Sequence, residues 1–219
     1  MTSIALAVLA GIAVFWSGIL AAAAFEPAYS HRRDYVSTLA AHGAEQAGIA
    51  ILAILGAAGA MVFAALLLRP HSRAAALMVA LAGVGFVVAA FTRLECPNGA
   101  AGCGLGGRFE VSGSIEIGHW TATTVSSALL IGGIALTGIA LVRRGRRLAG
   151  IASVAAAAVT AGAFLATGGD SPGVIQRIGI VVATAWLAPF AVMTLARPSR
   201  RENAGSGSMT PRGASAERL

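Results

Sequence analysis

Six long apolar runs, separated by short charged or glycine-rich stretches, constrain this chain more than any other feature of its sequence. They lie near residues 4–24, 47–68, 74–92, 117–142, 148–167 and 178–196. A helix needs about 20 apolar residues to cross the hydrocarbon core of a bilayer, and each run is about that long. Only 11 % of the residues are charged, against about 25 % in soluble domains. The sequence therefore predicts an all-α fold, a polytopic bundle of six transmembrane helices.

The same pattern divides the chain into two parts. Residues 1–196 form the predicted transmembrane domain, whereas residues 197–219 lack apolar periodicity and contain many Gly, Ser and Arg residues. Such a segment cannot bury enough apolar surface to fold by itself. We expect it to be a disordered basic tail beside an anionic membrane surface.

The arginines predict the orientation of the spans. All sixteen basic residues are arginines, and eleven fall on the side that holds both termini: Arg69, Arg73, Arg143, Arg144, Arg146, Arg147 and five in the tail. Basic residues concentrate in cytoplasmic loops, so we expect cytoplasmic termini in a cytoplasmic (inner) membrane. The Ala-rich, lysine-free composition is typical of a bacterial source. Topology thus explains the net charge of +7, and neither nucleic acid nor nucleotide is expected as a partner, because the sequence shows no basic face and no nucleotide-binding motif.

The two cysteines, Cys96 and Cys103, lie in one outward loop and flank a compact Pro-Asn-Gly turn. We predict that they form a disulfide, which an oxidising compartment would preserve. A redox pair would need the closer C-x-x-C spacing, and a zinc site would need further ligands nearby.

Polar residues collect in the outward segments. In the first outward loop Asp34 could cap a short helix that ends at Gly43, with Ser37 as an ordinary helical hydroxyl. Glu116 and His119 are spaced to share one helix face at the start of the fourth run. Charges at a membrane boundary need partners, so we expect a polar cluster in which Arg177 pairs with Asp34 or Glu116. The members of this cluster are Asp34, His42, Arg93, Glu116, His119 and Arg177.

Three short stretches carry a family resemblance: residues 33–39 (Arg-Asp-Tyr-Val-Ser-Thr-Leu), the cysteine turn followed by Gly118-His119, and residues 173–177 before a run ending Leu195-Ala196-Arg197. Together they resemble the domain-of-unknown-function 998 family over nearly the whole chain. The resemblance implies a small six-span membrane protein, and it carries over Asp34, Ser37, Cys96, Cys103, His119 and Arg177. The chain departs from the family pattern at Leu39-Ala40-Ala41, where Leu-Gly-Ala is frequent, and it lacks an Asp in the cysteine turn. Both departures weaken any inherited catalytic role.

Three functions from different classes fit these residues. The first is a non-catalytic protein, without cofactors, that binds a lipid headgroup or small amphiphile at the outward cluster, with membrane lipids as its partners. The ligand-binding residues would then be Asp34, Ser37, Arg93, Glu116, His119 and Arg177. The second is a small transporter or accessory subunit, which would act as a homo-oligomer or with a membrane partner.

The third function is a zinc-dependent lipid hydrolase, similar to the transmembrane hydrolases related to alkaline ceramidases. Its catalytic candidates are Asp34, Ser37, His42 and His119, with zinc held by His42, His119 and Asp34 and with Ser37 holding the water or the oxyanion. Those hydrolases resemble a seven-span design with a paired-His motif near the end of the chain, whereas the fifth and sixth runs here contain no His. We therefore favour the binding protein and expect no metal.

Overall fold

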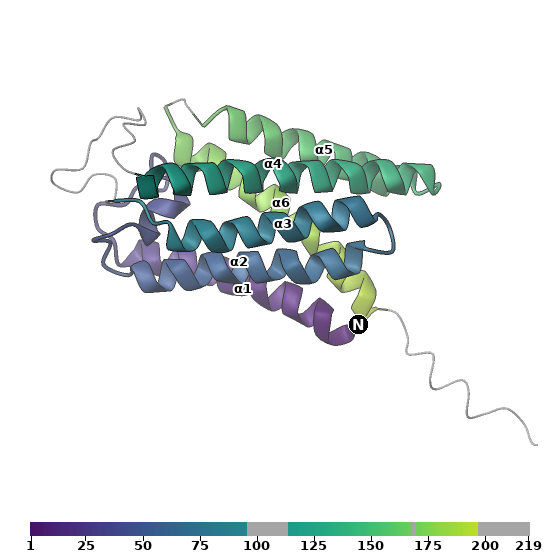
Figure 1. Cartoon of the computed structure of the whole chain (residues 1–219), viewed down its shortest axis with the longest axis horizontal. Helices are drawn as coiled ribbons and strands as arrows, with labels where there is room; N and C mark the ends of the chain where they lie inside the picture. The colour runs from purple at the N-terminus through teal and green to yellow at the C-terminus, as the bar shows by residue number, and fades with distance from the viewer. Residues whose placement is uncertain (96–113, 168–169, 197–219) are drawn as a thin grey trace, which may run out of the picture.

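The computed structural model describes residues 1–95, 114–167 and 170–196 (Figure 1). Every element within these ranges is helical, which confirms the predicted all-α fold. The elements are α1 (Thr2–Ala24), the short 3-10 helix η1 (Val36–Ala40), α2 (Ala47–Leu68), α3 (Arg73–Phe91), α4 (Ser114–Arg143), α5 (Arg147–Leu165) and α6 (Pro172–Leu195). The six α-helices match the six predicted runs, and each is long and apolar enough to cross a membrane.

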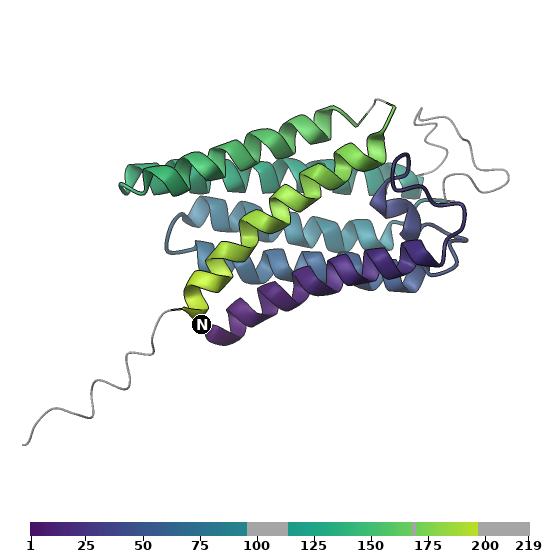
Figure 2. The ribbon, with the colours of Figure 1, turned by 180° about the vertical axis from the view of Figure 1, so that it is seen from behind.

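Consecutive helices pack side by side and alternate in direction, since α1 packs on α2, α2 on α3, α3 on α4 and α4 on α5. Helix α6 crosses one face of this row diagonally, on the side toward the viewer in Figure 2, and contacts α5, α1 and α2. One end of the bundle, here called the terminal end, holds the start of α1 and the end of α6. The opposite end, the loop end, holds η1. The predicted tail and the predicted Cys96–Cys103 disulfide lie outside the described residues.

Two helices extend beyond the predicted apolar runs at the loop end. Helix α4 begins at Ser114 rather than at residue 117, and α6 begins at Pro172 rather than at residue 178. Proline suits the first turn of a helix because the amide N–H that it lacks has no helical acceptor there. Hydropathy marks only the apolar part of a helix, so Gln176 and Arg177 belong to α6 instead of preceding it.

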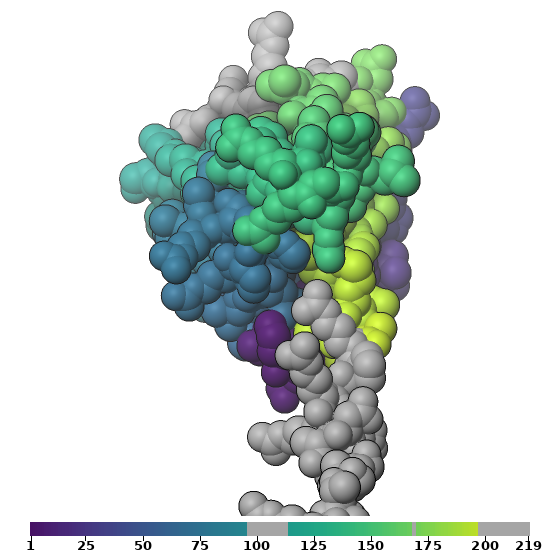
Figure 3. Space-filling model, turned by 90° about the vertical axis from the view of Figure 1, so that its right-hand side faces the viewer, coloured from purple at the N-terminus to yellow at the C-terminus, as the bar shows by residue number. Residues whose placement is uncertain are grey.

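The terminal end is closed by two short turns that lie against each other (Figure 3). The side chain of Ser72 accepts a hydrogen bond of 3.2 Å from the Ala75 N–H and so caps α3. Gly145 adopts a φ of 79° in the turn between α4 and α5, a conformation that favours glycine. The Arg144 guanidinium donates a bond of 2.7 Å to the Pro70 carbonyl and thereby links the two turns.

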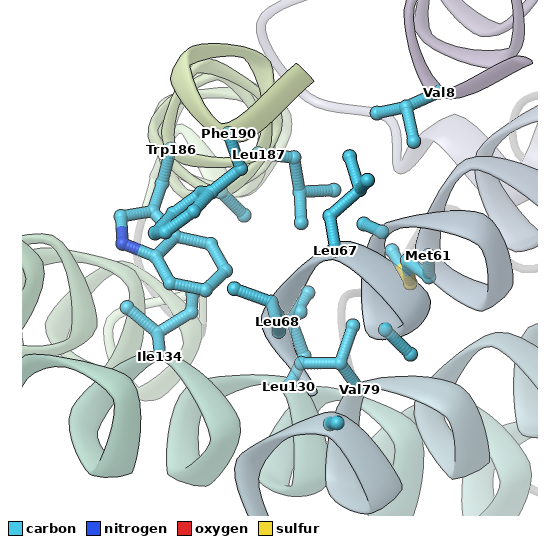
Figure 4. Packing of buried hydrophobic residues seen from close by; sticks show 14 of the residues in the cluster. Val8, Met61, Leu67, Leu68, Val79, Leu130, Ile134, Trp186, Leu187 and Phe190 are labelled. Carbon is cyan, nitrogen blue, oxygen red and sulfur yellow. The ribbon is translucent and has the colours of Figure 1, made fainter. Parts of the chain in front are cut away.

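Large side chains fill the half of the bundle near the terminal end (Figure 4). Trp186, Leu187 and Phe190 of α6 are buried against Leu68 of α2 and Ile134 of α4. The indole N–H of Trp186 also donates a bond of 2.9 Å to a serine hydroxyl of α5. Apolar contacts between these helices therefore hold this half of the bundle together.

Glycines allow the closest helix contacts. A Cβ atom added at Gly11 would lie 2.5 Å from the carbonyl oxygen of Gly56, and one at Gly150 would lie 2.7 Å from that of Gly138. Lipid tails are as apolar as the helix surfaces, so membrane helices associate through close packing of small residues rather than through hydrophobic burial. The small residues of the predicted spans therefore set the spacing of the α1–α2 and α4–α5 pairs.

Candidate functional site

The segment between α1 and α2 folds back over the loop end of the bundle. We call residues 29–42, which include η1, the η1 segment. Val36 and Leu39 within it are buried against α1 and α2, with exposed fractions of 4 % and 1 %. Burial of these apolar side chains holds the segment against the bundle instead of leaving it as a free linker.

Arg177 of α6 fastens the beginning of the η1 segment. One guanidinium nitrogen donates to the carbonyl oxygens of His31 and Asp34, at 2.7 and 3.1 Å, and to that of Gly173 in its own helix. The other terminal nitrogen donates to the Tyr29 hydroxyl, and the guanidinium carbon lies 5.4 Å from the centre of the Tyr29 ring. Arg177 thus acts mainly as a donor of several hydrogen bonds to backbone carbonyl groups.

The role predicted for Asp34 is wrong in its details. Arg177 does contact Asp34, but through the backbone carbonyl rather than the carboxylate. The Asp34 carboxylate accepts a bond of 2.6 Å from the Ser30 N–H and closes a turn before η1, so it does not cap that helix. Helix η1 ends at Ala40, before Gly43, where the backbone of Ala41 becomes extended. A short polar side chain hydrogen-bonds its local backbone as readily in a turn as at a helix start.

Further bonds join the η1 segment to the start of α6, and the sequence did not predict them. The Gln176 side-chain oxygen accepts a bond of 2.8 Å from the Val36 N–H. The Gly173 N–H donates to the Arg32 carbonyl at 3.0 Å, and a Cβ atom at Gly173 would lie 2.6 Å from the Asp34 carbonyl oxygen. Gln176 directly precedes Arg177 in the sequence, and this position was the signal that could have placed its side chain against the η1 segment.

Arg93 fastens the other end of the η1 segment. Its Nε and Nη2 donate to the carbonyl oxygens of Ala40 and Ala41, at 2.7 and 2.8 Å. These carbonyls end η1 and lack helical partners, so a cationic donor satisfies them well. The His42 N–H then bonds the Leu94 carbonyl at 2.9 Å, while the His42 side chain is exposed.

Tyr29 is neutral at physiological pH. Burial raises the pKa of Tyr29 to about 12, and this effect exceeds the opposing effect of the Arg177 charge. The phenol oxygen therefore accepts from the guanidinium as a neutral group.

A cavity of about 330 Å³ lies beneath the η1 segment, inside the bundle. All six α-helices and η1 contribute to its wall. Near the loop end its lining includes the polar side chains Ser37, His119, Thr123 and Gln176, beside apolar ones such as Val36 and Phe164. Its deeper wall is largely apolar and includes Ile54, Met61, Leu130 and Ile131.

His119 has an unusual position in this wall. The ring is only 2 % exposed, and Nδ1 lies 3.0 Å from the carbonyl oxygen of Ala89. A carbonyl can only accept, so Nδ1 carries the proton and Nε2 presents a lone pair. This Nε2 atom is buried and finds no hydrogen-bond partner within the part of the chain that the structure describes. An acceptor buried in this way costs free energy unless a ligand or water satisfies it.

The predicted residues thus separate into groups with different positions. Ser37 and His119 line the cavity, whereas Asp34, Arg93 and Arg177 hold the η1 segment. Glu116 lies half-buried at the beginning of α4. Among the described residues, no group of three His, Cys, Asp or Glu side chains is placed to hold a metal ion. The structure does not bring the predicted zinc set of Asp34, His42 and His119 together, because the His42 side chain is exposed and the Asp34 carboxylate closes a turn.

Comparisons with known proteins identify a family but no activity. A family model described as "Protein of unknown function (DUF998)" matches residues 9–193. Comparison with curated proteins and with solved structures gives no match.

Proposed function

Because this chain belongs to the DUF998 family, whose function is unknown, we propose a function from its own geometry: it binds a small amphiphile in the cavity beneath the η1 segment. The observation that carries this proposal is the cavity itself, which has several polar side chains near the loop end and a mostly apolar wall deeper in the bundle. Such a gradient complements a molecule with one polar end and one apolar chain.

The size and position of the cavity support this function. Small-molecule sites have volumes of about 300–1,000 Å³, and about 330 Å³ lies at the lower end of that range. A site of this size suits a single-chain amphiphile better than a two-chain lipid. The site also lies among helices that can cross a membrane, where such molecules concentrate.

The η1 segment supports a binding role in a different way. It is bonded at one end by Arg177 and at the other by Arg93, so the polar wall of the cavity is held in a fixed position before any ligand arrives. A preformed site loses less conformational entropy on binding than a flexible one. The predicted arginines would therefore act by positioning the site rather than by touching the ligand.

Filling the cavity tests the proposed function. Ala57 lies on the cavity wall, whereas Leu52 of the same helix is 64 % exposed on the outer surface. We expect Ala57→Phe to abolish saturable binding of a radiolabelled single-chain amphiphile such as decanol, and Leu52→Phe to leave it unchanged. Mass spectrometry of organic extracts of the purified protein should also find an amphiphile with the wild type that is depleted in Ala57→Phe. Wild-type affinity in Ala57→Phe would refute a site in this cavity.

A further inference from the structure

The charge of the cavity wall restricts the headgroup that it can accept. No Asp, Glu, Arg or Lys side chain lines the cavity within the described residues. Burying a charged headgroup without a counter-charge costs far more free energy than burying a neutral one. The two nearby arginines donate to backbone carbonyls of the η1 segment instead of reaching the cavity wall. The wall therefore favours an uncharged headgroup over a carboxylate, a phosphate or an ammonium.

Three threonine hydroxyl groups of the wall can act only as acceptors toward a ligand. Thr123, Thr160 and Thr184 each donate their hydroxyl proton to a carbonyl in the preceding turn of their own helix, at 2.8 to 2.9 Å. Their remaining lone pairs can accept, but they have no second proton to give. The Thr184 oxygen already accepts from the indole N–H of Trp16 at 3.2 Å.

His119 adds an acceptor atom that lacks a hydrogen-bond partner among the described residues. Its Nδ1 proton is committed to the Ala89 carbonyl, so Nε2 can only accept in the neutral ring. This atom is buried without a partner in the described part of the chain, and the residue lines the cavity. A ligand that donates a proton to Nε2 would remove this unsatisfied acceptor.

Gln176 supplies the complementary group. Its side-chain oxygen is occupied by the Val36 N–H, so the amide nitrogen is the group left to face a ligand, as a donor. A headgroup that meets both His119 and Gln176 must donate one hydrogen bond and accept another. A hydroxyl group does both and carries no charge.

We propose that the cavity selects an uncharged single-chain amphiphile with a hydroxyl headgroup, which donates its proton to Nε2 of His119. This inference rests on the proposed function, since it names the ligand class of the same cavity. It also gives the buried Nε2 of His119 a hydrogen-bond partner, which this atom lacks among the described residues.

Three probes with the same chain length test the headgroup. Binding of radiolabelled decanol, decanoate and decyltrimethylammonium to the full chain in nonionic detergent should be compared at pH 8, with nonspecific micelle uptake subtracted. We expect saturable decanol binding at least about tenfold tighter than that of either charged probe. Equal or tighter binding of a charged probe would overturn the headgroup inference and leave the proposed cavity function standing. Saturable binding of none of the three would overturn both.

Variants of His119 test the acceptor. His119→Ala should weaken decanol binding by about tenfold, the value of one hydrogen bond to a buried group, whereas His119→Gln restores an acceptor oxygen and should recover part of the loss. Ser126→Ala is the matched control, because Ser126 is equally buried on α4 but does not line the cavity. Decanol affinity unchanged in both folded His119 variants would overturn the role of Nε2. If His119→Ala does not fold, His119→Gln and the probe series still decide the inference.

Discussion

Replacing Arg177 by Ala should destabilise the protein, because this side chain joins the η1 segment to α6. The substitution removes the donors to the His31 and Asp34 carbonyls and to the Tyr29 hydroxyl. The Gly173 carbonyl also loses this bond, but it keeps its ordinary acceptor role in the α6 ladder. The cost therefore arises mainly from the backbone of the η1 segment, whose carbonyls are left without their cationic partner.

The magnitude follows from the environment of each lost bond. A hydrogen bond to a charged group contributes about 1.5–3 kcal/mol, and an orphaned buried acceptor costs about 1–3 kcal/mol. The bonds to Asp34 and Tyr29 are partly buried, whereas the bond to His31 is exposed and adds little. We expect Arg177→Ala to lower the free energy of unfolding by about 3 kcal/mol. For a chain of this size, that corresponds to a fall of roughly 6–12 °C in the unfolding midpoint.

The assay is thermal unfolding of detergent-purified variants, followed by circular dichroism at a fixed heating rate. Arg33→Ala serves as the control, because it removes an exposed arginine from the same segment. Arg177→Lys keeps the charge but not the planar fork, so its midpoint should lie between those of the wild type and Arg177→Ala. An Arg177→Ala midpoint no lower than that of Arg33→Ala would refute the assigned role, since Arg177 would then act only as a solvated charge.

Four further outcomes are expected. Gly11→Ala should destabilise the bundle by about 1–3 kcal/mol, because the added Cβ atom would meet the backbone of α2. Gly59→Ala is the control, because a Cβ atom there has no neighbouring atom within 4 Å. Equal unfolding midpoints of the two variants would contradict this prediction. Because folding raises the Tyr29 pKa from 10.0 to about 12, stability should fall as pH rises through that interval, and Tyr29→Phe should flatten the fall in a pH series of melts. Arg93→Ala should speed amide hydrogen exchange in η1, measured by mass spectrometry. A reporter fused after Leu219 should be active in the cytoplasm, and activity only outside would reverse the predicted orientation.

The sequence by itself determined where the chain crosses the membrane. Apolar runs of about 20 residues can bury their backbone polar groups in a bilayer only as helices. The number of spans, the all-α class and the placement of the start of α1 and the end of α6 at one end of the bundle therefore follow from local composition. The same local information predicted a short helix between the first two spans, although its end at Ala40 rather than Gly43 coincides with bonds from the distant Arg93 to the carbonyls of Ala40 and Ala41.

Only the tertiary structure decided which polar groups meet. Arg177 and Asp34 are far apart in sequence, and whether a guanidinium reaches a carboxylate or a backbone carbonyl depends on how α6 crosses the bundle. Likewise, His119 gains its significance from the carbonyl of Ala89 on α3, which fixes its proton. Hydropathy is a property of each segment alone. Hydrogen bonds and cavities depend on the positions of atoms on several helices to within about an ångström. No local sequence pattern specifies those atomic positions.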